Sequence, residues 1–441
     1  MEVIVEMVYA SSGLLKGVLI DSWTAYSWRD VTGWPHQHPK IEMLEEKIQS
    51  LGIRSRCNVL KITDVEIIHN RKPVALPEPW RPAWHEPDIK PQGATSFSFL
   101  KIYTDEGITG VGPCLPPNSL PPAYIAFVKS TLIGSDPFYV ERFFETNMGG
   151  REATTSSLGG VDAALWDIIG KASGRPVYKL LGACRDRVPV YIATAQLHSP
   201  EEHAKEAVKY RNEGVRAIKL RLHRPNHEDD LEVVKAVRDA VGDDMDIMVD
   251  ANQNNYAPSY NYWSRRTAMW MAKKLDALNV YFLEDPLPLR DVEGIKQLAD
   301  AVDMNVSGGE HSNHVYQFRD LLFSGAFDIV QPDIIIGNPG IGISGIKRVA
   351  QIADSVGRMI VPHVYTGGIS GLHLAATLQV MGTVKNCPFV EYPLEPPALT
   401  IETQHGLLKE PIRIEGDGCV QVPQLPGIGV EINQEFVEKH M

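Results

Sequence analysis

The sequence predicts an α/β protein in which a parallel β/α barrel follows an N-terminal α+β capping domain. Short apolar runs recur through residues 188–393 about every 20 to 35 residues, and stretches with helical periodicity separate them. Such alternation of strands and helices favours a parallel sheet. The alternative is a doubly wound open sheet, which would be expected to carry a glycine-rich phosphate loop after an early strand. No such loop follows the early strands here.

Eight apolar runs are the predicted barrel strands. They are "VPVYIAT" (188–194), "AIKLRL" (217–222), "DIMVDA" (246–251), "VYFLEDP" (280–286), "NVSGGE" (305–310), "IVQPDI" (329–334), "MIVPHV" (359–364) and "FVEYP" (389–393). The stretch "PEEHAKEAVKYRNEG" between the first two has apolar residues three to four apart and ends at Gly214, which is typical of a helix with a C-cap glycine. The barrel is therefore expected over residues 185–395.

The segments on either side have other patterns. Residues 57–184 predict the capping domain, with antiparallel strands in "KITDVEIIHN" and "FSFLKIYTDEGITGVGPC", a turn at Thr104–Gly107, and a helix in "TSSLGGVDAALWDIIGKASG". Residues 396–441 return to strand and turn patterns and are expected to cross back to the cap. Residues 1–56 fit neither unit. They are a genuine extension, a loose arm, or upstream translation with Met43 as the alternative start, and metal binding at "HQHP" (36–39) is disfavoured.

Composition excludes several classes of function. The net charge of −12 with no Lys/Arg cluster argues against a nucleic-acid partner. Five cysteines, odd in number and far apart, indicate reduced thiols in a cytoplasmic protein. Charges interrupt the apolar start, so no membrane segment is expected. Neither a nucleic acid nor a membrane is therefore expected as a partner.

Polar side chains end successive predicted strands. In a parallel barrel the carboxyl ends of all strands meet at one mouth, so these groups are expected to lie together. In strand order they are Lys219 and Arg221, Asp250 and Asn252, Glu284, Glu310, Asp333, His363 and Glu391.

Three neighbouring carboxylates, Asp250, Glu284 and Glu310, predict a Mg²⁺ site. Anions this close raise one another's pKa, and a divalent cation with oxygen ligands relieves the repulsion. Each carboxylate taken alone would more simply pair with a Lys or Arg, but three at consecutive strands favour the metal. Asp285, of opposite strand parity to Glu284, is expected to be structural. Asp333 and His363 lie on adjacent strands, where a carboxylate can orient the imidazole as a general base.

These motifs resemble the mandelate racemase subgroup of the enolase superfamily over residues 57–440. The matching pieces are "GGVDAALWDIIGKASGRPVYKLLG", "IKLRL", "VDANQ", "LEDPLP", "GGE", "QPDI", "PHVYTGG" and "LPGIGVEI". The resemblance implies a modified TIM barrel, (β/α)7β, under an α+β cap, and a homo-oligomer. It also implies Mg²⁺ on Asp250, Glu284 and Glu310, an Asp333–His363 dyad, and Lys219 and Glu391 at the substrate carboxylate, where charge develops during proton abstraction.

One departure from the family pattern decides between reactions. Racemases of the family usually carry a second lysine where this chain has Arg221, and arginine is a poorer base by about two pKa units or more. With His363 as the one good base, the sequence favours dehydration of a sugar acid to a 2-keto-3-deoxy acid. The alternatives are a racemase or epimerase of a 2-hydroxy acid and a non-catalytic metal-binding barrel.

Four further residues are candidate substrate contacts. Asn252 is expected beside the substrate or the metal shell, and His223 is either a leaving-group acid or a residue lining the rim. Trp84 and His85 lie in the proline-rich segment Pro77–Lys90, which predicts a shaped loop without regular structure. That loop is either an ordered surface loop or a lid that selects the distal end of the substrate.

Overall fold

The computed structural model describes residues 6–9, 15–19, 59–147, 158–254, 259–336, 340–364 and 368–441. The chain divides into two compact units, Met1–Val59 and Leu60–Met441. In the first unit β1 (Glu6–Tyr9) and β2 (Leu15–Leu19) pair antiparallel. The motif "HQHP" and Cys57 lie outside the described residues. Among the described helices none has the length and apolar character needed to cross a bilayer.

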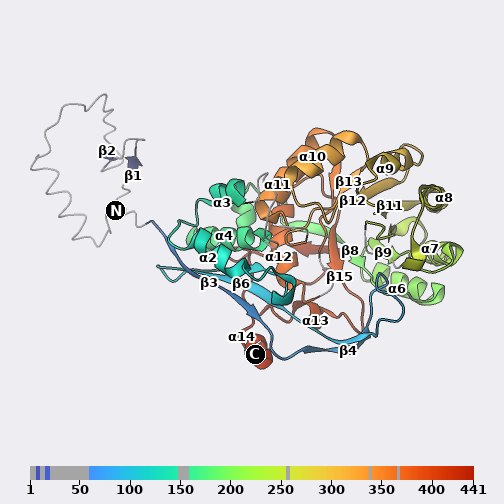
Figure 1. Ribbon diagram of the computed structural model, residues 1–441, viewed down its shortest axis with the longest axis horizontal. Helices are drawn as coiled ribbons and strands as arrows, with labels where there is room; N and C mark the ends of the chain where they lie inside the picture. Colours follow the sequence, from blue (N-terminus) through green and yellow to red (C-terminus); the bar gives the residue numbers. More distant parts are fainter. Residues whose placement is uncertain are drawn as a thin grey trace, which may run out of the picture. The chain divides into compact units, whose positions relative to one another are not determined.

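Eight parallel strands form the sheet of the second unit (Figure 1). They are β8 (Arg187–Ala193), β9 (Ala217–Arg221), β10 (Asp246–Asp250), β11 (Val280–Glu284), β12 (Asn305–Gly308), β13 (Ile329–Val330), β14 (Met359–Ile360) and β15 (Val390–Pro393). The ladder runs from β14 through β8 to β15. Two hydrogen bonds link the regions of the end strands β14 and β15. Ile360 N donates to Asn386 O at 3.0 Å, and Val364 N donates to Glu391 Oε2 at 3.0 Å.

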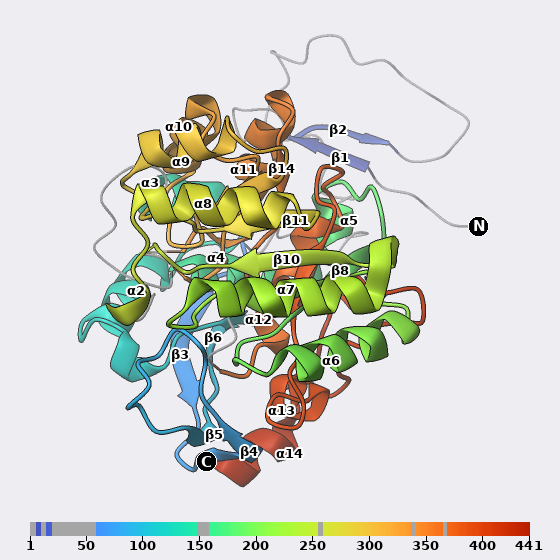
Figure 2. The same ribbon diagram turned by 90° about the vertical axis from the view of Figure 1, so that its right-hand side faces the viewer.

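One helix follows each of the first seven strands, which confirms the predicted (β/α)7β pattern. These helices are α6 (Pro200–Asn212), α7 (His227–Val241), α8 (Arg265–Asp276), α9 (Val292–Ala299), α10 (Val315–Ser324), α11 (Gly342–Ser355) and α12 (Gly371–Met381), with short helices η2 (Gly242–Asp244) and η3 (Ser259–Asn261) between them. Figure 2 shows α7 and α8 on the outer side of β10. A capping box between Ser199 and Glu202 starts α6, and Gly214, just beyond its end, has the positive φ predicted for a C-terminal glycine.

Side chains at alternate positions along the barrel strands form two separate apolar layers. Residues such as Val249 and Leu283 pack toward the helices, whereas an inner cluster contains Tyr191, Ala193, Ala217, Met248, Phe282, Ile329 and Val361. Side chains two residues apart share one face of a strand. The positions two residues beyond Met248, Phe282 and Val361 therefore continue the inner face at the carboxyl ends of their strands.

The capping domain contains a three-stranded antiparallel sheet in the order β3–β6–β7. Its elements are β3 (Ile62–His69), β6 (Ser98–Thr104), β7 (Thr109–Pro113), η1 (Pro117–Ser119), α2 (Tyr124–Leu132), α3 (Val140–Asn147), α4 (Leu158–Ala172) and α5 (Val177–Leu180). The α4 helix lies so close to β7 that a Cβ on Gly112 would meet Gly160 O at 2.1 Å. Glycine is required there for close packing.

A separate hairpin joins β4 (Val74–Trp80) to β5 (Gln92–Thr95). The sequence predicted no regular structure from Pro77, but β4 continues to Trp80, and this part of the prediction is wrong. The strand tolerates Pro77 and Pro79 because it lies at the edge of a two-stranded sheet, where missing N–H donors remove no ladder bond to a second neighbour.

The C-terminal segment is more helical than its sequence pattern predicted. It contains α13 (Ile401–His405), one short strand β16 (Cys419–Gln421) paired with β8, and α14 (Gln434–His440). His440 O accepts hydrogen bonds from Arg71 N and Lys72 N at 2.9 Å, so the chain end lies against the cap.

The pattern GxGxxG occurs at Gly340–Gly345, before and into α11, where a Cβ on Gly342 would meet Asp162 at 2.6 Å. These glycines follow the sixth barrel strand and serve close packing.

Candidate active site

Lys219 lies at the centre of the carboxylates. Its Nζ is 2.8 Å from Glu284 Oε2, 2.9 Å from Glu391 Oε1 and 4.0 Å from Asp250 Oδ2, and the side chain is 1% exposed. Burial alone would lower the pKa of Lys219, but the charges of Glu284 and Glu391 outweigh it and raise the pKa above its ordinary value. The lysine is therefore a permanent cation among acids from three strands.

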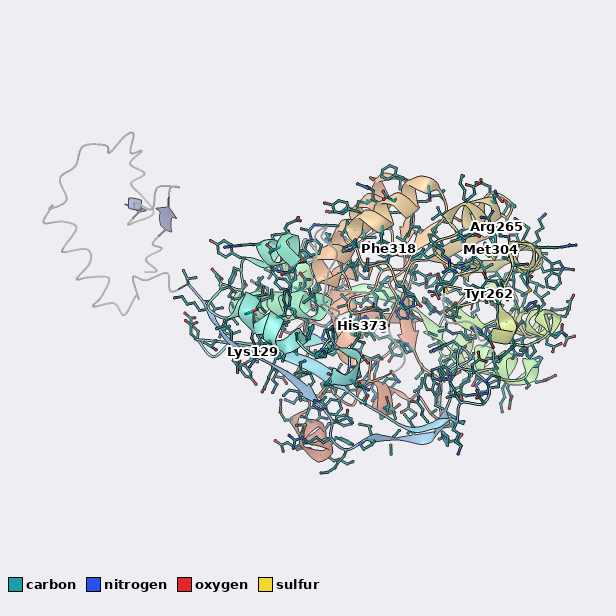
Figure 3. All side chains as sticks on the ribbon, viewed as in Figure 1. Lys129, Tyr262, Arg265, Met304, Phe318 and His373 are labelled. Atoms are coloured by element: carbon teal, nitrogen blue, oxygen red, sulfur yellow. The ribbon has the colours of Figure 1, made fainter. Side chains whose placement is uncertain are left out.

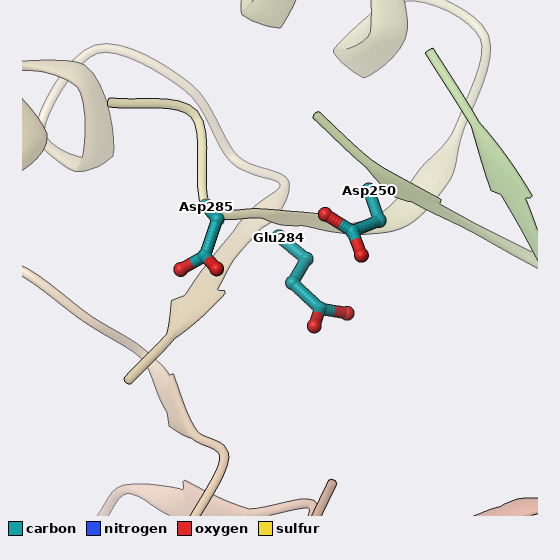
Figure 4. Close-up of side chains that lie close together, drawn as sticks. All are labelled: Asp250, Glu284 and Asp285. Atoms are coloured by element: carbon teal, nitrogen blue, oxygen red, sulfur yellow. The ribbon is translucent and has the colours of Figure 1, made fainter. Parts of the chain in front are cut away.

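The carboxylates of Asp250, Glu284 and Asp285 each place an oxygen within 4.8 Å of the others (Figure 4). Burial, reinforced by Asp250, raises the pKa of Glu284 to about 7. Glu284 Oε1 and Asp285 Oδ2 are buried and have no hydrogen-bond partner within the described residues. Closely spaced anions with unused oxygen lone pairs fit a divalent cation that prefers oxygen ligands.

Glu310 lies apart from this group of three. Its Oε1 is 2.9 Å from His311 Nε2, and its Oε2 is 3.3 Å from His363 Nε2. It is still close enough to raise the pKa values of Asp250 and Glu284. The chain turns at Gly309, with φ of 100°, before reaching Glu310, so this carboxylate enters the mouth from a loop and faces two imidazoles.

Strand parity predicts that Asp285 points away from Glu284, but Asp285 has a φ of 47°, which ends the regular strand, and its carboxylate lies beside those of Asp250 and Glu284. A Cβ on Gly308 would lie 2.4 Å from Asp285 Oδ1, so the carboxylate packs directly against the next strand, where only glycine leaves room. Burial and the neighbouring acids raise its pKa well above the ordinary value.

His363 and Asp333 form the expected pair. His363 Nδ1 is 2.6 Å from Asp333 Oδ2, and Asp333 Oδ1 accepts from Ile335 N at 2.6 Å and Ile336 N at 2.7 Å. Burial alone would lower the pKa of His363, but Glu310, Glu391 and Asp333 raise it to about 10. The carboxylate thus holds one ring nitrogen and leaves Nε2 directed toward the acids of the mouth.

Sequence reasoning missed His373 and set aside His311. His373 lies on α12 (labelled in Figure 3), and its Nε2 is 3.3 Å from Asp333 Oδ1. Its helical segment gives no strand-end pattern, so no sequence feature marks it. The sequence favours a surface position for His311 over one at the mouth; in the structure its side chain contacts Glu310, which directly precedes it.

Arg221 braces the carboxylates. Its guanidinium forms an ion pair with Asp250, donates from Nε to Thr194 O at 2.9 Å, and donates to Asn252 Oδ1 at 3.2 Å. Burial would lower the pKa of Arg221, but Asp250 and its neighbours raise it. A guanidinium held this way cannot release a proton to act as a base.

Asn252 and His223 form a buried pair beside Arg221. His223 Nε2 is 2.8 Å from Asn252 Oδ1, and the ring is fully buried. His223 lies just past the end of β9, its side chain has no exposed surface, and Tyr260 Oη donates to His223 O. Burial lowers the pKa of His223 to about 4.

Trp84 and His85 reach the mouth from the β4–β5 hairpin. The Arg221 guanidinium lies 4.8 Å from the centroid of the Trp84 ring. The His85 ring is edge-on to Trp84 at 6.4 Å, and burial, with Arg81, lowers its pKa. The described loop therefore covers one side of the strand ends.

A capped (β/α)7β barrel with acids and a His–Asp pair at its strand ends is the architecture of an enolase-type acid–base enzyme. Residues 74–182 match the mandelate racemase/muconate lactonizing enzyme N-terminal domain, and residues 202–436 match the enolase C-terminal domain-like family. The chain belongs to the mandelate racemase and muconate lactonizing enzyme family of the enolase superfamily.

Curated relatives include sugar acid dehydratases. L-talarate/galactarate dehydratase of Salmonella typhimurium is 30% identical over 78% of this chain and 83% of its own. Arabinonate dehydratase of Saccharolobus solfataricus is 29% identical over 77% of this chain and 89% of its own. D-galactarolactone cycloisomerase of Agrobacterium fabrum, 30% identical over 76% and 89%, shows that the similarity extends to another reaction.

Solved structures have the same fold. D-glucarate dehydratase from Agrobacterium tumefaciens, complexed with magnesium, has a TM-score of 0.71 and 28% identity, with 86% of this chain and 98% of that chain covered. A mandelate racemase-like protein from Bordetella bronchiseptica has a TM-score of 0.72 at the same identity and coverage.

Proposed function

We propose that this chain is a Mg²⁺-dependent hydro-lyase that dehydrates a sugar acid, an aldonate or aldarate, to a 2-keto-3-deoxy acid. The observation that carries the proposal is the asymmetry of the mouth. His363, oriented by Asp333, is a base, whereas Arg221, two residues beyond Lys219, is committed to Asp250. Abstraction and return of a proton on opposite faces needs two bases, but elimination of water needs only one.

The metal ligands in this proposal are Asp250, Glu284 and Glu310. Their strand-end placement, the raised pKa of Glu284 and its unpartnered oxygen support it. When bound, Mg²⁺ supplies positive charge that stabilises the anion developing on the substrate carboxylate. An oxygen of Asp285 also lies within 4.8 Å of oxygens of Asp250 and Glu284. Its close packing against Gly308 supports a structural role.

Side chains of the protein carry out the steps of proton transfer and charge stabilisation. When Glu310 holds the cation, its charge is neutralised and no longer raises the pKa of His363, so a neutral Nε2 is available. This Nε2 takes the C2 proton, and the electron pair of the broken C–H bond moves into the carboxylate. Lys219 binds that carboxylate, and Glu391 in its protonated form donates a hydrogen bond to it. The fixed ammonium becomes more favourable as charge grows. The electron pair then returns from the carboxylate to form the C2–C3 double bond as the C3–O bond breaks, and the hydroxyl leaves as water with the proton that His363 took from C2. The resulting enol gains a proton from water at C3 and releases its hydroxyl proton to water, which gives the keto acid.

Three candidate contacts surround the rest of the substrate. Asn252, Trp84 and His85 are proposed to face its hydroxyl groups. Arg221 is proposed to brace Asp250 and to border the same space. His223 is proposed to act through Asn252, because it is buried and its low pKa makes it a neutral hydrogen-bond partner at neutral pH.

The experiment is a panel of aldonic and aldaric acids incubated with the enzyme and Mg²⁺. A keto acid that reacts with semicarbazide is expected for at least one substrate. In D₂O, deuterium at C2 with inversion and no keto acid would instead establish a racemase. His363→Asn is expected to abolish turnover while leaving Mg²⁺ binding intact. Normal turnover by this variant would show that His363 is not the base.

We further propose a homo-oligomer in the cytoplasm, with a cap over residues 57–184, the barrel over 185–395 and a returning segment over 396–441. Family resemblance supports the assembly and the domain limits. The described cysteines Cys114, Cys184, Cys387 and Cys419 are free, which supports a reducing compartment. Sedimentation of the purified protein tests the assembly.

A further inference from the structure

Glu395 is a buried carboxylate just past the end of β15, outside the catalytic groups. It is 2% exposed. One oxygen accepts from Trp80 Nε1 at 2.9 Å, and the other accepts from Ala195 N at 3.0 Å and Gln196 N at 2.9 Å. His198 Nε2 lies 3.6 Å away. Burial would raise the pKa of Glu395, but these donors lower it, so an anion stays in place at neutral pH.

The partners of Glu395 belong to two different parts of the fold. Trp80 ends β4, while Ala195 and Gln196 lie in the loop after β8. Trp80 also packs in a small apolar cluster with Leu76, Ala195, Ala398 and Leu399. Glu395 therefore ties the hairpin of the cap to the carboxyl end of the barrel.

The lid loop, residues 81–91 between β4 and β5, continues from this attachment across neighbouring strand ends. Ala83 N donates to Ala195 O at 2.7 Å, in the loop after β8. Ser259 N donates to Glu86 Oε1 at 2.7 Å, in the loop after β10. The lid loop thus spans the distance from β8 to β10 over the mouth.

Between these two attachments Trp84 lies against Arg221, which pairs with Asp250. The electron-rich face of an aromatic ring attracts a cation, so this contact stabilises the position of Trp84. The position of Trp84 depends on where Trp80 is held four residues earlier. Displacement of Trp80 would separate Trp84 from Arg221 and open this side of the mouth.

We propose that Glu395 is a positioning residue that holds the lid loop closed and thereby sets the affinity for the distal, polyhydroxylated end of the sugar acid. The affinity part rests on the proposed function. Glu395 does not touch the reacting atoms, which lie near His363 and Lys219. Its loss is therefore expected to raise KM and to leave kcat within about twofold, because uniform binding is lost without loss of transition-state stabilisation.

The substitution Glu395→Gln tests the charge without changing the shape. Three N–H groups donate to the two carboxylate oxygens, whereas an amide offers one acceptor oxygen and one donor NH₂. If the amide oxygen keeps the backbone donors, its NH₂ faces the Trp80 indole N–H. Two donors facing each other release Trp80. Trp80→Phe removes that donor and relieves the conflict in the double variant.

The first measurement is hydrogen–deuterium exchange of residues 81–91, which needs no substrate. We expect exchange at least about tenfold faster in E395Q than in the wild type, a factor that corresponds to loss of one charge-assisted hydrogen bond. The W80F/E395Q variant should be less affected than the sum of its single variants. Glu410→Gln, an exposed carboxylate elsewhere, is the matched control and should exchange as wild type. Unchanged exchange in E395Q would overturn the positioning role.

The second measurement is steady-state kinetics on the sugar acid turned over by the wild type. We expect KM to rise about tenfold in E395Q, with the largest rise for the longest substrates, and kcat to stay within twofold. Faster exchange with unchanged KM would overturn the affinity part. If the wild type dehydrates no sugar acid, the proposed function fails, while the exchange experiment still decides whether Glu395 holds the lid loop.

Discussion

Replacement of Lys219 by methionine tests the electrostatic core of the site. The ammonium lies 2.8 Å from Glu284 and 2.9 Å from Glu391. At an effective dielectric constant of about 20, one such contact is worth roughly 6 kcal/mol before the cost of burying the ion. Removing one partner of a buried ion pair typically costs about 3–5 kcal/mol. We therefore expect Lys219→Met to lower the free energy of unfolding by that amount at pH 8.5, measured in urea with a chelator present.

The loss in the free energy of unfolding caused by Lys219→Met should be smaller at low pH. Burial and Asp250 raise the folded pKa of Glu284 to about 7, above its ordinary value of 4.5, so ionisation of Glu284 destabilises the fold as the pH rises through this window. Without Lys219 the folded pKa rises further. At pH 5.5 Glu284 of the variant is protonated and needs no cation. Lys385→Met, at a lysine that is 77% exposed, is the control. An equal loss at both pH values would refute this reasoning.

Four further outcomes are expected. Asp333→Asn should lower kcat at least about 100-fold with little change in KM, because the amide no longer favours the reactive tautomer of His363; steady-state kinetics measures this. Glu284→Gln should weaken Mg²⁺ binding in calorimetry, and removal of Mg²⁺ from the wild type should abolish dehydration until the metal is restored. His373→Phe should lower kcat about 10- to 100-fold and His373→Gln less, since Asp333 loses a contact that orients it. Wild-type kcat in His373→Phe would exclude that role.

The barrel could be predicted from the sequence because its strands and helices alternate in the sequence in the same order as in the fold. Each predicted run overlaps one observed strand, since apolar residues bounded by polar and glycine residues are what a buried parallel strand requires. Lys219, Asp250, Glu284 and His363 were predicted to lie together because they end successive parallel strands, whose carboxyl ends meet at one mouth. Parity did not place Asp285, because its φ of 47° ends the strand and leaves its carboxylate beside Asp250 and Glu284.

The lid hairpin and the C-terminus were predicted less well. Prolines in β4 suggested irregular structure, but an edge strand needs few of its own donors. The short helices α13 and α14 lie near the C-terminus and pack against residues far away in the sequence. The ring of Phe436 in α14, for example, contacts Phe97 in the cap. Sequence windows of this length contain no information about such contacts.

The sequence by itself determined the order of strands and helices, the family, and the chemical groups at the strand ends, because periodicity and residue type are local properties. Only the tertiary structure decided which of these groups meet. It paired Arg221 with Asp250, turned Glu310 toward His363, brought His373 to Asp333 from α12, and tied Trp80 to Glu395 across 315 residues. Distances between side chains from distant segments depend on how helices and loops pack around the barrel, and no single stretch of the chain encodes that packing.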